Sequence, residues 1–172
     1  MSYSLYAAIV PSYLQVLRGS LSWLAKAEHF AAAEGRTEAE MMDARLAPDM
    51  LPFNRQVRGF AMHAQGGIEG AIGGVFSPDP TPAPTTFAGL NERVATAIGA
   101  LEALDPVAVD ALEGKPMRFI IGSTNLPFLA DQFLLSFSQP NFFFHTTTAY
   151  AILRNLGMTI GKMDYLAHLR TM

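Results

Sequence analysis

Cysteine is absent from the 172-residue sequence. Its absence excludes disulfides, thiolate nucleophiles, iron–sulfur clusters and thiolate-ligated zinc. A chain of this length can remove roughly 70% of its extended surface from water on folding, so it can form a stable domain without a covalent cross-link. We therefore expect a single domain over residues 1–172.

Charged residues are scarce as well. They make up 16% of the sequence and give a net charge of −3, whereas average proteins carry about 25%. The basic residues are scattered, and Arg55 and Arg58 are the one close pair in an expected helix. No basic stripe is available for a phosphate backbone, so we predict no nucleic-acid partner. Because hydrophobic residues make up 50%, we expect a large core and a homodimer interface.

Long hydrophobic runs are also missing. No stretch approaches the roughly 18 uninterrupted apolar residues of a membrane span, so we expect no membrane association. The N-terminal segment reads MSYSLYAAIVPSYLQVLRG. It has neither basic residues ahead of its apolar positions nor a small-residue cleavage site. Together with the lack of cysteine, this segment indicates a cytoplasmic protein.

Four stretches show helical periodicity, with apolar residues at steps of three and four. We expect helices from Tyr6 to a stop at Gly35, from just after Asp49 to the glycines near residue 70, from Thr86 to Leu104, and from about Leu126 to Leu156 with an interruption at Pro140. Asp49 and Thr86 are the expected helix caps. The pattern predicts an all-α fold, arranged as an antiparallel four-helix bundle.

Short features separate these stretches. Thr37 and Glu40 have the capping-box spacing of a short helix. The segment at 77–84, SPDPTPAP, contains four prolines and is a linker because proline cannot continue a helix. The run MRFII at 117–121 is strand-like. We expect a short extended excursion or hairpin near residues 115–122.

Glycines crowd the second expected helix. Five of them lie close together: Gly66, Gly67, Gly70, Gly73 and Gly74. Each interior glycine costs a helix about 1 kcal/mol relative to alanine. Either another backbone comes very close at this point, or the helix has begun to end.

A dense motif occupies the C-terminal part of the sequence, which reads PNFFFHTTTAYAILRNLGMTIGKMDYL from Pro140. This run resembles the signature of a bacterial family known as domain of unknown function nineteen ninety-three. Upstream, APDMLPFNRQVRGFAMHA resembles the second helix of that family more loosely. The family is similar in fold to the DinB/YfiT superfamily of four-helix bundles, so the resemblance implies a bundle, often dimeric, with a pocket at one end.

The resemblance also implies a metal site, because the wider superfamily holds a divalent ion such as zinc or nickel on three histidines. One comes from the second helix and two from a His-xxx-His pair on a later helix. His63 takes the first position here, but His145 has Ala149 at i+4 and Asn141 at i−4, so the pair is broken. A site built from His63, His145 and a carboxylate such as Glu28 is conceivable. Catalytic zinc usually has three protein ligands.

Other side chains near His145 suggest a ligand pocket. Tyr150 and Arg154 lie one helical turn apart, and Phe144 and Phe137 belong to a phenylalanine-rich patch around Pro140. An imidazole, a phenol and a guanidinium that converge on a pocket would suit a small anion or a carbonyl oxygen. Alternatively, His145 bonds a neighbouring side chain or carbonyl, Arg154 pairs with a carboxylate such as Asp164, and the aromatic residues form core or a dimer seam.

Two functional hypotheses follow from these patterns. In the first, the protein binds a small molecule near His145, Tyr150 and the phenylalanines, and its metal site is degenerate. In the second, it is a DinB-like metal-dependent transferase, isomerase or hydrolase with His63 and His145 as ligands. The loss of the His-xxx-His pair favours the first.

Overall fold

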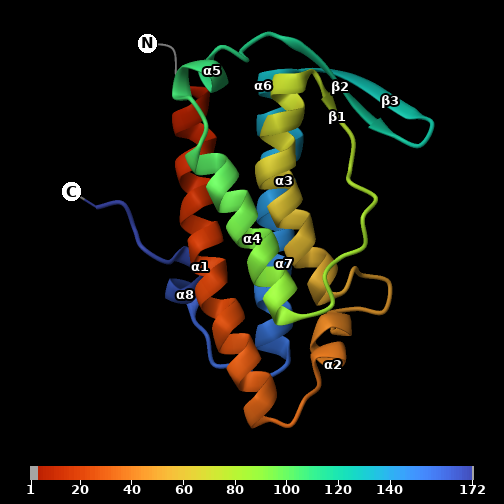
Figure 1. Cartoon of the computed structure of the whole chain (residues 1–172), viewed down its shortest axis with the longest axis vertical. Helices are drawn as coiled ribbons and strands as arrows, with labels where there is room; N and C mark the ends of the chain where they lie inside the picture. The colour runs from red at the N-terminus through yellow and green to blue at the C-terminus, as the bar shows by residue number, and fades with distance from the viewer. Residues whose placement is uncertain (1–3, 172) are drawn as a thin grey trace.

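Four long helical stretches dominate the computed structural model, which describes residues 4–171 (Figure 1). Their bounds are Leu5–Ala33 for α1, Phe53–Gly73 for α3, Phe87–Glu102 for α4, and a continuous run of α6 (Ala130–Phe133), the π-helical turn η1 (Leu134–Ser138) and α7 (Gln139–Asn155). Three short helices are Glu38–Asp43 for α2, Pro106–Asp110 for α5 and Lys162–Leu166 for α8.

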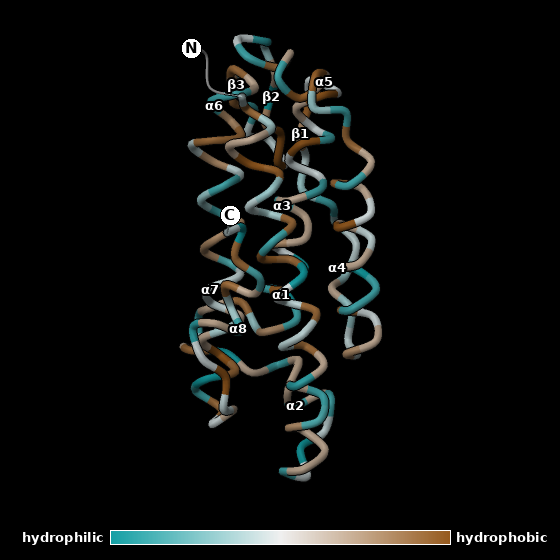
Figure 2. The backbone as a smooth tube through the Cα atoms, turned by 90° about the vertical axis from the view of Figure 1, so that its left-hand side faces the viewer, coloured by the Kyte–Doolittle hydropathy of each residue, from teal (hydrophilic) through white to brown (hydrophobic). Residues whose placement is uncertain are grey.

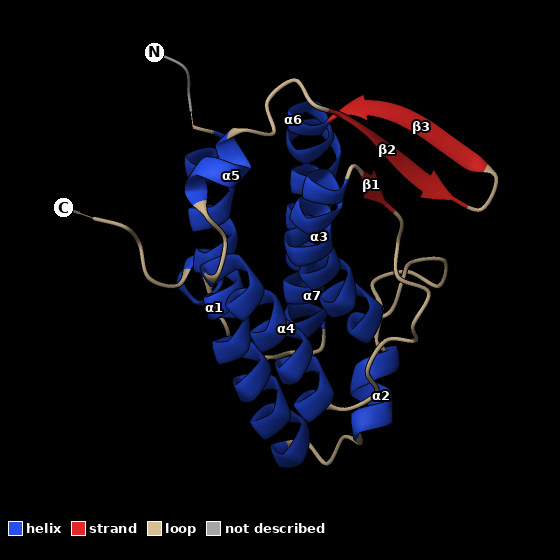
Figure 3. Cartoon of the chain, turned by 45° about the horizontal axis from the view of Figure 1, so that its top comes forward, coloured by secondary structure: helices blue, strands red, loops and turns tan. Residues whose placement is uncertain are grey.

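The all-α prediction was wrong, because the described residues also form a mixed three-stranded sheet at one end of the helices (Figure 3). Its strands are Val75–Phe76 for β1, Pro116–Ile121 for β2 and Thr124–Leu129 for β3. Strand β2 pairs in parallel with β1 and antiparallel with β3. The hairpin expected near 115–122 is therefore present, but residues 126–129 are a strand instead of the start of the last helix.

The helices are not simply antiparallel either. Residues 77–86 run back along the side of α3 towards the end of the molecule where α3 begins. As a result, α4 runs in the same direction as α3 (Figure 1). An extended chain advances up to about 3.5 Å per residue, against 1.5 Å in a helix, so ten extended residues can span the 21 residues of α3. The four prolines of this segment favour that extended form.

One core unites the helices and the sheet. Figure 2 shows hydrophobic and hydrophilic stretches alternating along each long helix. The fully buried Trp23 of α1 packs against Phe53 and Phe60 of α3, and Phe142 of α7 packs against Tyr13 and Phe60. Within residues 4–171, no helix is both long and apolar enough to cross a bilayer.

The predicted helix starts are mostly confirmed. Thr37 and Glu40 form the capping box of α2, and Thr86 accepts a bond from the Gly89 amide at the start of α4. Asp49 does not cap α3, which begins four residues later behind Pro52 without a side-chain cap. Its first amide, that of Phe53, is instead bonded to the Ala44 carbonyl at 2.8 Å, so backbone from the preceding loop replaces the expected aspartate.

The glycines of α3 let other segments approach closely. A Cβ on Gly67 would lie 2.2 Å from the Ser138 hydroxyl oxygen, and one on Gly70 would lie 2.8 Å from the Cβ of Phe76. Gly74 ends the helix in a left-handed conformation with φ of 78°. Both explanations of the glycine cluster are therefore confirmed, at different positions.

The π-helical turn explains how α7 continues through Pro140. Proline lacks an amide hydrogen, and in a regular α-helix its ring collides with the carbonyl four residues before it. The wider turn at 134–138 relieves this collision, and the Asn141 side chain donates to the Phe137 carbonyl at 2.8 Å. The turn ends at Ser138, whose hydroxyl donates to the His63 carbonyl at 2.9 Å.

Gly67→Ala should destabilise the protein despite the better helix propensity of alanine. The new methyl group would displace the buried Ser138 hydroxyl and break its bond to the His63 carbonyl, which costs about 1–3 kcal/mol. We expect the free energy of unfolding in urea to fall by about 1 kcal/mol net of the helix gain. Gly99→Ala is the control, since no atom lies within 4 Å of a Cβ at that position. Equal stability of the two variants would contradict this account of the contact.

Candidate functional site

His63 of α3 and His145 of α7 lie side by side. Their ring centroids are 5.8 Å apart and their planes differ by 16°. A Cβ on Gly59 would lie 2.9 Å from the Cγ of His145, so the imidazole of His145 rests on bare α3 backbone. The sequence therefore needs glycine at position 59, one turn before His63, to bring the two rings together.

Gln56 fixes the protonation of the His145 ring. Its amide nitrogen donates to the Leu51 carbonyl at 2.9 Å, so its oxygen is the atom that lies 2.7 Å from His145 Nδ1. An amide oxygen can only accept, which means that Nδ1 carries the proton. In the neutral ring the lone pair then lies on Nε2. No residue in 4–171 bonds this nitrogen, and it is not fully enclosed.

Burial keeps both imidazoles neutral at physiological pH. It lowers the pKa of His63 to about 4, with a smaller contribution from the neighbouring His145. Burial also lowers the pKa of His145 below its ordinary value. A neutral imidazole with a free Nε2 can accept a hydrogen bond or a proton, or bind a metal.

His145 lies in the wall of a cleft of about 870 Å³, which we call the histidine cleft. The loop at 43–52, the first turns of α3 and the proline-rich segment at 79–85 form its other walls. Two side chains of α3 hold that segment in place. Asn54 donates to the Pro84 carbonyl at 3.1 Å, and the Arg58 guanidinium donates to the Asp79 carbonyl.

A three-ligand metal site does not fit these residues. Within 4–171, no group of three or more His, Asp or Glu side chains is arranged to hold an ion. Glu28, the carboxylate considered from the sequence, is exposed on α1. His145 Nδ1 is also already occupied by Gln56. The pair supplies two imidazole ligands at most, one fewer than catalytic zinc normally uses.

The two predicted phenylalanines lie on either side of the histidine pair. Phe137 is half-buried and packs against His63, with ring centroids 5.8 Å apart. It also packs against Phe119 of β2 and Phe133 of α6. Phe144 is 57% exposed, and its ring edge contacts His145. Phe137 thus closes the buried side of the pair, whereas Phe144 lies at the surface.

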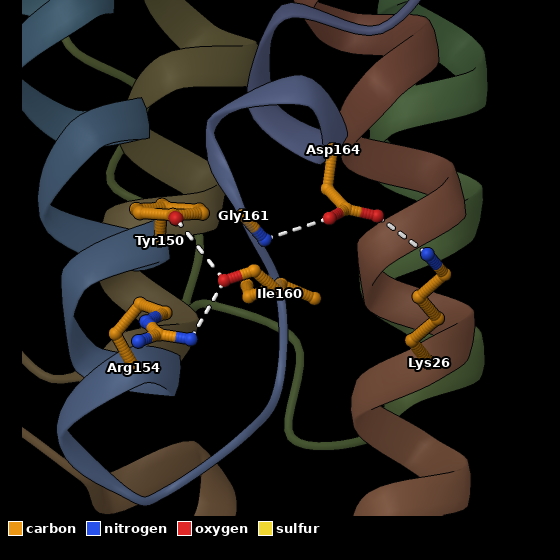
Figure 4. Close-up of polar contacts among 6 residues, drawn as sticks. All are labelled: Lys26, Tyr150, Arg154, Ile160, Gly161 and Asp164. Carbon is orange, nitrogen blue, oxygen red and sulfur yellow. Dashed lines mark hydrogen bonds and ion pairs between the residues drawn. The ribbon is translucent and has the colours of Figure 1, made fainter.

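Tyr150 and Arg154 do not line the histidine cleft with His145 but bind the chain after α7 (Figure 4). The Ile160 carbonyl accepts from the Tyr150 hydroxyl at 3.3 Å and from Arg154 Nη1 at 2.7 Å. Arg154 also donates to the Met158 carbonyl, so its partners are backbone carbonyls instead of the predicted Asp164. The structure brings His63, His145, Phe137 and Phe144 together, and it places Tyr150 and Arg154 elsewhere.

A clasp at 160–167 accounts for the rest of the C-terminal motif. Asp164 accepts from the Gly161 amide at 2.7 Å and pairs with Lys26 of α1 at 2.5 Å (Figure 4). Ala167 packs so closely on α1 that a Cβ on Gly19 would lie 2.9 Å from it. The clasp joins α7 to α1, so most of the motif serves the fold and not the histidine cleft.

Sequence reasoning missed Gln56, Gly59 and Ser138, which position the two histidines. Gln56 and Gly59 both lie within the stretch that resembles the second helix of the family, at seven and four residues before His63. Those steps place all three on one face of a helix. That spacing was the available signal, but it does not reveal which distant residue each would meet.

Asp164→Asn should lower stability in a pH-dependent way. The Gly161 amide, followed by Lys26, lowers the pKa of Asp164. The carboxylate therefore stabilises the fold fully above its unfolded pKa of about 3.9, and this contribution is lost as the pH falls through the lower folded value. Urea denaturation should show a loss of about 1 kcal/mol at neutral pH that shrinks as the pH falls below the unfolded pKa of about 3.9. Asp43→Asn is the exposed control, and a pH-independent loss would contradict the assignment.

The tautomer of His145 can be read by nitrogen NMR. In the wild type, Nδ1 should have the chemical shift of a protonated ring nitrogen and Nε2 that of an unprotonated one. Gln56→Leu removes the acceptor and should produce a mixture of tautomers, whereas the exposed Gln132→Leu should change nothing. A wild-type spectrum with the proton on Nε2 would refute the assignment.

Comparisons with known proteins identify the family and a similar structure. The sequence profile of the domain of unknown function DUF1993 matches residues 5–166. The crystal structure of a DinB family member protein from Shewanella denitrificans is similar to this chain, with a TM-score of 0.80 and 28% identity over 98% of this chain and 94% of that one. No curated protein matches the sequence. The resemblance read from the C-terminal motif is confirmed, and the chain belongs to the DUF1993 family with a DinB-like structure.

Proposed function

We propose that the protein binds a small molecule in the histidine cleft and that His145 Nε2 accepts a hydrogen bond from this ligand. The observation that carries the proposal is the bond from His145 Nδ1 to Gln56, which leaves Nε2 unprotonated on a residue that lines the cleft. A partly buried ring N–H needs an acceptor in any case, so the feature that points to a ligand is the second ring nitrogen, Nε2, which has no partner among residues 4–171.

The dimensions of the cleft support a small ligand. Its volume of about 870 Å³ lies within the roughly 300–1,000 Å³ of ligand sites. Apolar side chains such as Met50, Leu51 and Met62 alternate in its walls with polar and charged ones. Arg55 lies on α3 one turn before Gly59 and has no partner among residues 4–171. It is therefore available to an acceptor group on a ligand that also donates to His145.

The metal-dependent alternative has less support. Two histidines without a third protein ligand hold zinc or nickel weakly, and the described residues offer no group of three ligands around the pair. A binding role therefore explains the fixed tautomer with fewer assumptions than an enzymatic one. The homodimer and the cytoplasmic location predicted from composition stay predictions, and neither is needed for this proposal.

A fragment screen by protein-observed NMR tests the proposal. Neutral fragments that carry a hydroxyl or amide donor should shift the amide signals of residues 55–59 and 145. His145→Phe keeps a flat ring on Gly59 but removes both nitrogens. It should therefore lower the affinity for these fragments about tenfold, the equivalent of one hydrogen bond. His29→Phe, on the exposed surface of α1, should leave the fragment affinities unchanged.

Two results would overturn the proposal. One is a set of fragment hits that bind the His145→Phe variant as tightly as the wild type. The other is stoichiometric zinc or nickel in protein purified without chelator, lost in His145→Phe but kept in His29→Phe. The second result would establish the metal-dependent function instead.

A further inference from the structure

A second cleft lies beside the first and is not used by the proposed function. It has a volume of about 560 Å³ and opens between α3, α4 and β1. We call it the arginine cleft, after Arg93 of α4. Met62, Gly66 and Gly70 of α3 and Phe76 of β1 form its apolar side. It shares Met62 and Asp79 with the histidine cleft, but His145 does not line it.

Arg93 is a half-buried cation without a carboxylate partner. Its one hydrogen bond within residues 4–171 is from Nη1 to the Gln65 side-chain oxygen at 2.8 Å, and no carboxylate of these residues lies within 4.0 Å. The two acids of the cleft, Asp79 and Glu69, act on Arg93 electrostatically, but their direct contacts are with other residues. Glu69 accepts from the Gln65 amide, and Asp79 faces Arg58. Partial burial of a guanidinium is costly unless an acceptor compensates for the lost water.

Gly66 is not explained by packing. A Cβ there would lie 3.5 Å from the Phe76 ring and 3.9 Å from Met62, which is ordinary contact. Gly59, Gly67 and Gly70 differ, since each would place a Cβ within 3.0 Å of another segment. Alanine at position 66 would stabilise the helix relative to glycine, and packing leaves room for its methyl group. Because Gly66 lines the cleft, the missing methyl group enlarges the cavity beside Arg93.

We propose that the arginine cleft binds a small aromatic monocarboxylate. The carboxylate pairs with the fork of Arg93 N–H groups, which matches its planar geometry, and the ring lies over Gly66 between Met62 and Phe76. A flat ring suits bare helix backbone flanked by a thioether and a phenyl ring. Glu69 and Asp79 limit how much negative charge the cleft accepts, so a monoanion is favoured over a phosphate dianion.

Titration with benzoate, followed by protein-observed NMR, tests this site in the full chain. Benzoate should shift the amide signals of residues 62–70 and 93–96 in a saturable manner. Arg93→Gln should lower the affinity for benzoate about tenfold or more. Inorganic phosphate should not displace it. His145→Phe should leave benzoate affinity unchanged, which separates this site from the histidine cleft.

Gly66→Ala gives the sharpest result, because its two expected effects have opposite signs. The variant should unfold at a higher temperature than the wild type, yet it should bind benzoate at least about tenfold more weakly. Gly73→Ala is the matched control, since a Cβ there meets no atom within 4 Å. It should also raise the unfolding temperature but keep benzoate affinity. Unsaturated shifts up to about 10 mM benzoate, or undiminished binding by Gly66→Ala, would refute the proposal.

Discussion

Helix α3 and the continuous run of η1 and α7 approach each other over positions where α3 has no side chain. The His145 ring lies on Gly59, and the Ser138 hydroxyl lies against Gly67 and bonds the His63 carbonyl. A methyl group at either glycine would force the helices apart. The separation of α3 and α7 in turn sets the position of His145 beside Gln56. The geometry of the histidine cleft therefore depends on this one close packing contact.

The same contact determines the chemistry of the histidine pair. Because α7 lies so close, both imidazoles lose water, and burial lowers the pKa of each. Gln56 can then hold a neutral ring in one tautomer, since the Leu51 carbonyl orients its amide. A charged imidazolium would carry protons on both nitrogens and could not display a lone pair. Close packing and a free Nε2 are thus linked through desolvation.

The proline-rich segment at 77–86 has a comparable effect on the rest of the molecule. It returns the chain along α3 and makes α3 and α4 parallel neighbours (Figure 1). It also provides one wall of the histidine cleft and, through Asp79, part of the arginine cleft. The segment that reads as a plain linker in the sequence is therefore structural to both cavities. Arg58 and Asn54 keep it in place.

Periodicity and turn residues determined the long helices, the caps Thr37 and Thr86, and the hairpin, because these depend on neighbours within a few residues. The motif from Pro140 also identified the family. Tertiary structure alone decided the addition of β1 to the hairpin, the parallel course of α4, and the separation of Tyr150 and Arg154 from His145. Strand β1 is two residues long and gains its partner from β2, about forty residues away. Likewise, the role of Gly59 depends on a ring 86 positions further along the chain, and no local pattern encodes such a meeting.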